Sequence, residues 1–282
     1  MNDATLLRDY LGLQIVRLAK TVVQEPKHKS EMIIQHYLKI SKSDLYLKNI
    51  LIDKKDIKAL NIKFDKLMQN MPVQHIIGQT FFYDNRFLTP PGVFIPRPET
   101  ELLVDCAIDF LYLSKKKLKI LDLCTGSGCI VLSLAKKFPK HDFIGVDQSG
   151  LAIKTAKKNK KLLNINNVNF LKKDMFKLSM DKVDLLLCNP PYLAKKEIEN
   201  LDNSVKNHDP EKALTDYKDG TSFYKFLILN FKSLIKKNGA MYIELPYSSV
   251  TKKIELFNSK SNTNNSLFFK DVEGKNRVIK IY

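Results

Sequence analysis

The sequence predicts an α/β protein with a mostly parallel seven-stranded sheet, preceded by a small helical domain and a β-hairpin linker. Two observations predict this fold. After residue 117, short runs rich in Val, Ile and Leu alternate with helical segments, which is typical of a parallel sheet covered on both faces. Before residue 75, apolar residues recur at helical spacings instead. The expected domains are 1–75, 76–97 and 98–282, because 282 residues suffice for two unequal domains and a linker.

The N-terminal domain is expected to contain three helices. The first covers about residues 6–18, the second begins at Ser30 as an N-cap, and the third begins near Asp53. This stretch has no cluster of reactive side chains, which indicates packing and recognition of a partner as its roles. Residues 79–96 are rich in aromatic side chains around a Pro-Pro-Gly at 90–92, and this pattern predicts the β-hairpin.

The C-terminal part is expected to alternate strands and helices. Strands are predicted at 118–123, 143–147, 168–172, 183–188, 240–245, 267–271 and 278–282, the last two as a hairpin. Helices are predicted at 98–114, 127–138, 151–163 and 222–236, with a long polar segment at 193–221. Ligands of such sheets bind beyond the carboxyl ends of the strands. The residues that follow each strand are therefore the candidates for a functional site.

Composition and charge limit the classes of partner. The net charge of +17 suits an acidic macromolecule such as nucleic acid. However, only five of the 47 basic residues are arginine, the side chain best suited to bidentate recognition of phosphates and bases. We therefore interpret the charge mostly as solvated surface and expect no direct nucleic-acid substrate.

The cysteines and the apolar runs indicate the compartment. Cys106, Cys124, Cys129 and Cys188 form no C-x₂-C pair and have no histidine at metal-ligand spacing, so we expect reduced core residues and no metal. No apolar run approaches the roughly 20 residues needed to span a bilayer. The N-terminus has no targeting pattern. We expect a cytoplasmic, monomeric protein that does not contact membranes.

A glycine-rich turn follows the first predicted strand of the sheet. Gly126 and Gly128 let the backbone approach a ligand closely at the start of a helix, where N–H groups are free. A dinucleotide fingerprint would need a third glycine where Val131 stands. Asp122, at the strand end, would suit a cationic or amino-bearing ligand better than a pyrophosphate. Taken alone, the turn is equally compatible with an ordinary tight β–α connection.

Two further acids follow the next strands. Asp147 closes the second strand and can accept both hydroxyl groups of a ribose. After the third strand, Asp174 could bind an exocyclic amine, while Met175 and Phe176 flank an adenine ring. Each acid alone is more often a plain loop carboxylate. Together with Asp122, they describe a pocket for a nucleoside with a positive, amino-acid-like tail, which S-adenosylmethionine fits.

The fourth candidate is the sequence Asn189-Pro190-Pro191-Tyr192, directly after a buried strand. Two prolines fix the backbone as a rigid, extended loop and donate no N–H. The Asn189 carboxamide and the Pro190 carbonyl can accept both N–H bonds of a planar amino group, while the Tyr192 ring packs against it. These groups would position a poorly nucleophilic nitrogen for methyl transfer without a metal or a general base. The alternative interpretation is a proline-rich strand exit.

These motifs resemble those of class I, Rossmann-like S-adenosylmethionine-dependent methyltransferases. More closely, the chain resembles the release factor glutamine methyltransferase family, which methylates the glutamine amide of the Gly-Gly-Gln loop in peptide chain release factors. The resemblance rests on Gln74–Gly78, Phe94–Glu101, Asp122–Gly128, Asn189–Tyr192, Asp209–Leu214, Asp219-Gly220, Glu244 and Asp271–Arg277. The Pro-Arg-Pro-Glu-Thr-Glu segment at 96–101 is the most specific of these. After Glu244 the family often has a glycine, where this chain has Leu245-Pro246, and residues 257–266 are unusually rich in Asn, Ser and Lys.

The resemblance also implies roles for individual residues. It implies that the cofactor is bound by Cys124, Thr125, Gly126, Ser127, Gly128, Asp147, Asp174, Met175 and Asn189. It implies that the substrate glutamine is held by Asn189, Pro190, Pro191 and Tyr192. The helical N-terminal domain would dock the release factor. Two alternatives stay open: an amino-methyltransferase for adenine or cytosine in nucleic acid, and a non-catalytic S-adenosylmethionine-binding module.

Overall fold

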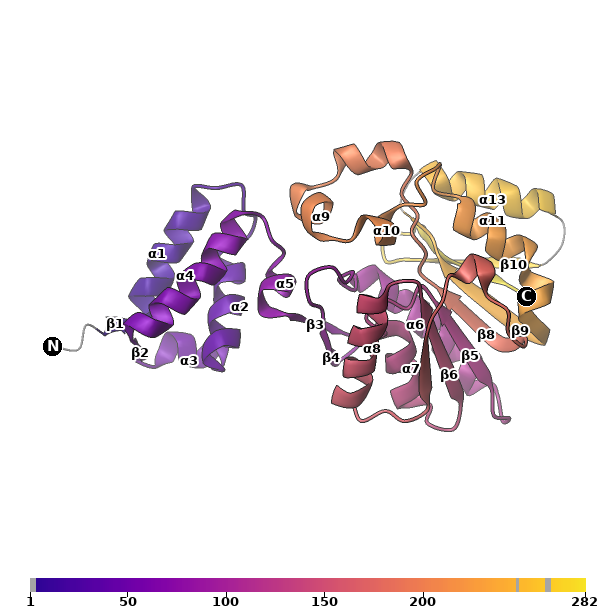
Figure 1. The fold of residues 1–282 in the computed structure, drawn as a ribbon, viewed down its shortest axis with the longest axis horizontal. Coiled ribbons are helices and arrows are strands. Elements are labelled where there is room, and N and C mark those ends of the chain that lie inside the picture. The colour runs from indigo at the N-terminus through magenta and orange to yellow at the C-terminus, as the bar shows by residue number, and fades with distance from the viewer. Residues whose placement is uncertain (1–3, 247–248, 262–264) are drawn as a thin grey trace. The chain divides into compact units, whose positions relative to one another are not determined.

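The computed structural model describes residues 4–246, 249–261 and 265–282, and these form two compact units. Unit 1 is the chain up to Gln79 together with Asp202–His208, and unit 2 is Thr80–Leu201 with Asp209–Tyr282 (Figure 1). Within the predicted Asn/Ser/Lys-rich stretch, residues 262–264 lie outside the described residues.

Unit 1 is helical, with its own apolar core. Its elements are β1 (Thr5–Leu6), α1 (Leu7–Ala19), α2 (Pro26–Leu38), α3 (Lys42–Leu47), β2 (Leu51–Ile52), α4 (Lys54–Met68), α5 (Val73–Ile77) and α9 (Asn203–His208). As predicted, the Asp53 side chain caps α4, accepting the Asp56 N–H at 2.7 Å. Ser30 is not an N-cap: α2 begins at Pro26, a residue preorganised for the first helical position, and the Ser30 hydroxyl donates to its carbonyl.

The β-hairpin and the segment that joins it to β5 (Lys119–Leu123) lie in unit 2, except for Gln79, the first residue of the hairpin, which lies in unit 1. They comprise β3 (Gln79–Phe82), β4 (Asn85–Leu88), η1 (Pro98–Thr100) and α6 (Glu101–Tyr112). The hairpin turns at Tyr83 and Asp84, both with positive φ, and not at the Pro-Pro-Gly. The buried Asn159 carboxamide ties the hairpin to the glycine turn, since its oxygen accepts the Leu88 N–H and its nitrogen donates to the Ser127 carbonyl, at 2.8 and 2.9 Å.

Unit 2 contains the predicted mostly parallel seven-stranded sheet, in the order β10-β11-β9-β8-β5-β6-β7. The strands are β5 (Lys119–Leu123), β6 (Asp142–Asp147), β7 (Val168–Lys172), β8 (Val183–Cys188), β9 (Ile235–Glu244), β10 (Ser266–Lys270) and β11 (Asn276–Ile281). β9, β8, β5, β6 and β7 run parallel, and β10 and β11 pair antiparallel. Because β8 lies on the opposite side of β5 from β6, the order reverses between β5 and β8, where such sheets bind ligands.

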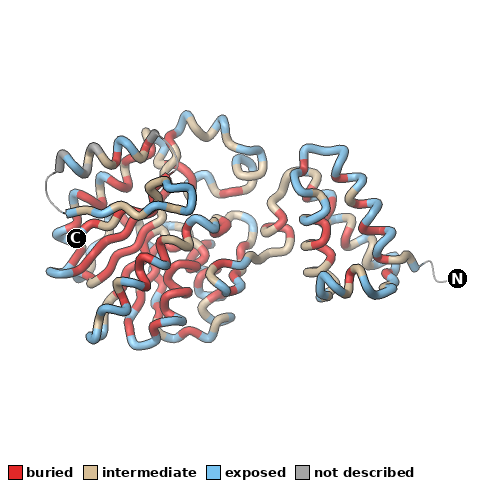
Figure 2. Tube along the Cα trace, turned by 180° about the vertical axis from the view of Figure 1, so that it is seen from behind, coloured by how far each residue is buried: buried red, intermediate tan, exposed pale blue. Residues whose placement is uncertain are grey.

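Helices cover both faces of this sheet, as the apolar strands predict (Figures 1 and 2). They are α7 (Cys129–Lys137), α8 (Gly150–Leu162), α11 (Ser222–Leu229), α12 (Phe231–Leu234) and α13 (Ser249–Ser261), together with α6. Ile120 and Leu185 pack with α6–α8, and their neighbours Leu121 and Leu186 pack with α11 and α13. Figure 2 shows the sheet as an almost continuous buried layer. None of the described helices is long and apolar enough to cross a membrane.

Several sequence-based predictions differ from the structure. The predicted helix at 222–236 is interrupted at Asn230, and β9 begins already at Ile235. The polar segment contains η3 (Lys195–Asn200), α9 and α10 (Glu211–Leu214), joined by short loops. A helix, α13, occupies part of the Asn/Ser/Lys-rich stretch, and its polar composition concealed its periodicity. The four cysteines are free, and all but Cys124 are buried.

Candidate active site

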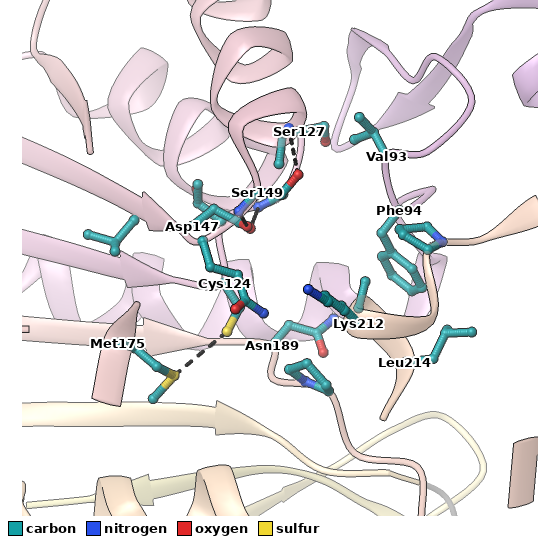
Figure 3. Close-up of a pocket in the computed structure, with 18 of the residues that line it drawn as sticks. Val93, Phe94, Cys124, Ser127, Asp147, Ser149, Met175, Asn189, Lys212 and Leu214 are labelled. Atoms are coloured by element: carbon teal, nitrogen blue, oxygen red, sulfur yellow. Dashed lines mark hydrogen bonds between the residues drawn. The ribbon is translucent and has the colours of Figure 1, made fainter. Parts of the chain in front are cut away.

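A cavity of about 560 Å³ opens at the carboxyl edge of the sheet, within unit 2 (Figure 3). Its lining residues come from 92–100, 124–130, 146–152, 173–176, 189–192 and 210–223. The volume falls in the range of roughly 300–1,000 Å³ that is usual for small-molecule sites. The carboxyl ends of β5, β6, β7 and β8, or the loops that follow them, all contribute residues to this lining. The structure therefore brings the four predicted motifs to one site.

The glycine turn forms one wall of the cavity. Gly126 and Gly128 have φ angles of +56° and +81°, and Cys124, with +58°, adopts the left-handed region that usually favours glycine. Cys124, Thr125, Gly126 and Ser127 line the cavity, and Gly128 does not. A Cβ at Gly128 would lie 3.2 Å from the Phe170 ring, so this glycine serves helix–sheet packing.

The acids at the strand ends occupy different environments. Asp122 is fully buried beneath the turn, accepts the Thr125 hydroxyl and does not line the cavity, and burial raises its pKa to about 7. Asp147 lines the cavity, and its two oxygens accept the N–H groups of Gly126 and Ser149 at 2.9 and 2.8 Å. Burial raises the Asp147 pKa, and these two hydrogen bonds oppose the shift.

The residues after β7 form an apolar wall. Asp174 caps the short helix η2 (Met175–Lys177) by accepting the Phe176 N–H at 3.0 Å. Asp174, Met175 and Phe176 all line the cavity, and the Phe176 ring lies 5.0 Å from that of Phe223. Met175 is buried, and its sulfur lies 3.8 Å from Cys124 Sγ.

The loop after β8 supplies the polar centre of the site. Asn189, Pro191 and Tyr192 line the cavity, whereas Pro190 is buried and does not. The Asn189 side-chain nitrogen donates to the Thr100 hydroxyl at 3.1 Å. Burial raises the Tyr192 pKa to about 12, so its phenol is neutral at physiological pH and acts as a ring and hydrogen-bonding group.

The sequence did not identify two segments that complete the cavity. Val93, Phe94, Pro96 and Thr100 line it from the hairpin side, and Pro210–Leu214 and Tyr217 line it from the polar segment. The Arg97–Asp209 ion pair, at 2.9 Å, joins the two segments. Figure 3 shows Phe94, Lys212 and Leu214 on the side of the cavity across from Asp147 and Cys124. In the sequence, these two segments were marked only by the Pro-Arg-Pro motif at 96–98 and the Asp-Pro motif at 209–210.

The backbone of the polar segment is fixed against the Asn189–Tyr192 loop. The Leu193 N–H donates to the Leu214 carbonyl at 2.8 Å, and the Thr215 hydroxyl donates to the Leu193 carbonyl at 2.6 Å. Gly220 has a φ of +81°, and a Cβ there would lie 2.3 Å from the Tyr192 carbonyl oxygen. Only glycine fits this close approach without moving the loop.

The chain resembles known methyltransferases in sequence and fold. Residues 114–281 match the family described as "Methyltransferase domain", and residues 14–78 match the "PrmC N-terminal domain". A release factor glutamine methyltransferase of Thermodesulfovibrio yellowstonii is 36% identical, over 89% of this chain and 90% of the relative. That of Fusobacterium nucleatum is 35% identical, over 96% of this chain and 77% of the relative.

A solved structure shares the fold alone. The hMettl16 catalytic domain, crystallised in complex with a 3′UTR hairpin, aligns with a TM-score of 0.57 at 15% identity, over 83% of this chain and 84% of that chain. This similarity agrees with the class I methyltransferase fold of unit 2. The identity to curated relatives over most of the chain is far higher. The chain belongs to the release factor glutamine methyltransferase family.

Proposed function

We propose that this protein transfers a methyl group from S-adenosylmethionine to the side-chain amide nitrogen, N5, of the glutamine in the Gly-Gly-Gln motif of peptide chain release factors. One observation carries the proposal. Asn189 and Tyr192, in the loop after β8 that we call the acceptor loop, line the same cavity as Asp147 and Met175, which are suited to bind a nucleoside. A planar nitrogen and a methyl donor can therefore meet in it.

The cavity residues suit S-adenosylmethionine. A Cβ at Gly126 would meet nothing closer than 4.0 Å, so the turn leaves open space for a ligand against its backbone. Cys124–Ser127 would hold the amino-acid tail, Asp147 the ribose, and Asp174 and Met175 the adenine, with Asn189 between cofactor and substrate. The lone pairs that Asp147 keeps beyond its two backbone partners can accept ribose hydroxyls. When bound, the sulfonium supplies an electrophilic methyl group.

The acceptor loop positions the glutamine for this transfer. The Asn189 oxygen lines the cavity and would accept one N–H bond of the amide, which orients the nitrogen toward the methyl group. The Pro190 carbonyl, predicted to accept the other N–H bond, belongs to a residue that does not line the cavity. Tyr192 packs against the amide plane, and Pro191 keeps the loop rigid. Held in this way, the nitrogen would receive the methyl group that bound S-adenosylmethionine supplies, S-adenosylhomocysteine would leave, and the nitrogen would release its proton to solvent. The contribution of the chain is orientation and electrostatic preorganisation.

Asp147→Asn should weaken binding of S-adenosylmethionine by about ten- to hundredfold, because hydrogen bonds to a charged group are worth about 1.5–3 kcal/mol. The asparagine NH₂ would also face the Gly126 or Ser149 N–H, donor against donor. Isothermal titration calorimetry measures the loss. Asp142→Asn, at the opposite end of β6 and exposed, is the matched control and should bind normally. Equal affinities for both variants would refute the ribose role of Asp147.

The release factor is the partner that this function requires. We infer that unit 1 docks it, because its helices present exposed apolar side chains such as Leu13 and Val16. We expect the protein to act as a monomer. Release factors work at ribosomes in the cytoplasm, and we expect the enzyme there.

Labelled S-adenosylmethionine tests the function directly. The purified protein is incubated with a release factor, with the same factor carrying Gln→Ala in its Gly-Gly-Gln motif, and with DNA and RNA. Label is expected on the unmodified factor alone. Label on the alanine factor would contradict the glutamine assignment. Label on nucleic acid only would favour the amino-methyltransferase alternative, and no transfer to any substrate would favour a non-catalytic module.

A further inference from the structure

A buried carboxyl group lies next to the acceptor loop and takes no part in the chemistry described so far. Glu244 ends β9 and is 3% exposed, and its Oε2 accepts no hydrogen bond from the residues that the structure describes. The parallel register pairs Cys188 with Ile243, so Asn189 and Glu244 follow at the same level of the sheet edge. Keeping an under-paired acid in the interior is costly and indicates a functional reason.

Thr100 connects this acid to the site. The Thr100 hydroxyl is buried and accepts a hydrogen bond from the Asn189 side-chain nitrogen, with 3.1 Å between the two atoms. Burial raises the Glu244 pKa to about 7, and hydrogen bonds from the Thr100 and Asn189 side chains lower it. Thr100 and Asn189 line the cavity and Glu244 does not. The acid therefore acts on the site through its two neighbours.

The Asn189 carboxamide has two chemically different ends of nearly the same shape. Its oxygen only accepts hydrogen bonds and its nitrogen only donates them. An ionised carboxyl group only accepts, so Glu244 favours the orientation that turns the Asn189 nitrogen toward Thr100 and itself. In that orientation the Asn189 oxygen remains for a substrate N–H. A half-turn of the carboxamide would place its oxygen against the Glu244 carboxylate.

We propose that Glu244, with Thr100, is a positioning group that fixes which end of the Asn189 carboxamide faces the substrate. This inference rests on the proposed function, in which the Asn189 oxygen accepts a glutamine N–H. When Glu244 is protonated, its O–H can donate to the Asn189 oxygen, and the inverted carboxamide is no longer disfavoured. In the inverted orientation, the Asn189 side-chain NH₂ faces the N–H bonds of the substrate glutamine, so the two donors repel and the glutamine is held poorly.

The charged groups that face Glu244 determine the pH at which it becomes protonated. Arg277, on β11, lowers the Glu244 pKa, and Glu99, on η1, raises it. Arg277 is itself paired with Asp271 at 3.0 Å. The other titratable side chains on which Glu244 acts are Cys129, Cys188, Tyr192 and Tyr224. Burial raises the pKa of each of these four groups, so they stay neutral near pH 7 and, of these five groups, only Glu244 changes charge there. Asp122, whose pKa is also about 7, lies beneath the glycine turn and accepts the Thr125 hydroxyl.

Activity against pH tests the proposal. The kcat for methylation of a release factor should fall as the pH drops through about 7 in the wild type. Glu244→Gln should lower kcat by about ten- to hundredfold on the alkaline side, because the charged acceptor is gone, and should abolish the inflection. Glu99→Gln should move the inflection to lower pH. An inflection that survives in Glu244→Gln would overturn the proposal.

Stability separates positioning from a merely structural role. The Glu244 pKa is raised from its ordinary 4.5 to about 7, so its ionisation destabilises the folded state as the pH rises between these values. Glu244→Gln removes that cost, so above pH 7 the variant should be at least as stable as the wild type, with Tm as the measure. A large drop in Tm, parallel to the loss of kcat, would assign Glu244 to structure.

The Thr100 pair provides a second set of variants. Thr100→Val keeps the side-chain shape and removes the hydroxyl, so it should lose activity, while Thr100→Ser should retain most of it. An activity-independent readout completes the design: in ¹⁵N NMR spectra, the Asn189 side-chain NH₂ signal should titrate near pH 7 in the wild type and not in Glu244→Gln. A signal that does not titrate refutes the inference, whereas failure to methylate any release factor refutes the proposed function.

Discussion

Asn189→Ala should lower kcat by about 10²- to 10³-fold while weakening cofactor binding by less than about tenfold, because single preorganised groups at reacting atoms contribute that much to catalysis. The Asn189 carboxamide lines the cavity, and Asn189 directly follows β8, which pairs with β5, the strand that leads into the glycine turn. Its loss removes a hydrogen bond to the reacting amide and leaves most of the cofactor wall intact. Single-turnover kinetics and calorimetry measure the two quantities separately.

Asn169→Ala is the matched control for this substitution. Asn169 lies on the edge strand β7, and its side chain is exposed. Its replacement should leave both kcat and cofactor affinity unchanged. If Asn189→Ala lost affinity and turnover equally, its role would be to bind the cofactor and not to orient the substrate.

Gly220→Ala should reduce kcat at least tenfold and lower Tm, although Gly220 does not line the cavity. Its Cβ would lie 2.3 Å from the Tyr192 carbonyl oxygen and 3.2 Å from the Ala194 nitrogen, and both are backbone atoms that cannot turn aside. The acceptor loop must therefore move. A displacement of about 1 Å at reacting groups can cost about 10²-fold in rate.

Gly274→Ala separates this clash from simple backbone strain. Gly274 has a similar φ of +76°, but a Cβ there would meet nothing within 4 Å. It should cost only the left-handed strain of roughly 1–2 kcal/mol, with unchanged kcat. If the two variants had the same kcat, the close packing of Gly220 against Tyr192 would be irrelevant to catalysis.

The sheet could be predicted from the sequence because its central strands β5 and β8 are buried on both faces. The predicted strand at 183–188 coincides with β8, of which all residues but Asp184 are buried. Continuous apolar runs of this kind are local signals, and the residues that follow them reach one edge of a parallel sheet by topology alone. Asp147 and Asn189 were therefore predicted to belong to one site without knowledge of any contact, and both line the cavity.

The rest of the cavity depends on contacts between distant segments. Thr100 meets Asn189 across 89 positions, and Arg97 meets Asp209 across 112, so no local pattern announces either pair. The sequence also does not indicate which motif residues face the cavity. Pro190 and Gly128 belong to the predicted motifs, yet neither lines the cavity, because membership of a motif does not say which way a residue faces.

The most direct test of the central claim is tandem mass spectrometry of a release factor after incubation with the protein and S-adenosylmethionine. We predict one added methyl group, located on the side-chain nitrogen of the glutamine in the Gly-Gly-Gln motif, and its absence when Asn189→Ala replaces the wild type. A methyl group on another residue of the factor, or an unmodified factor under conditions where the cofactor binds, would contradict the claim.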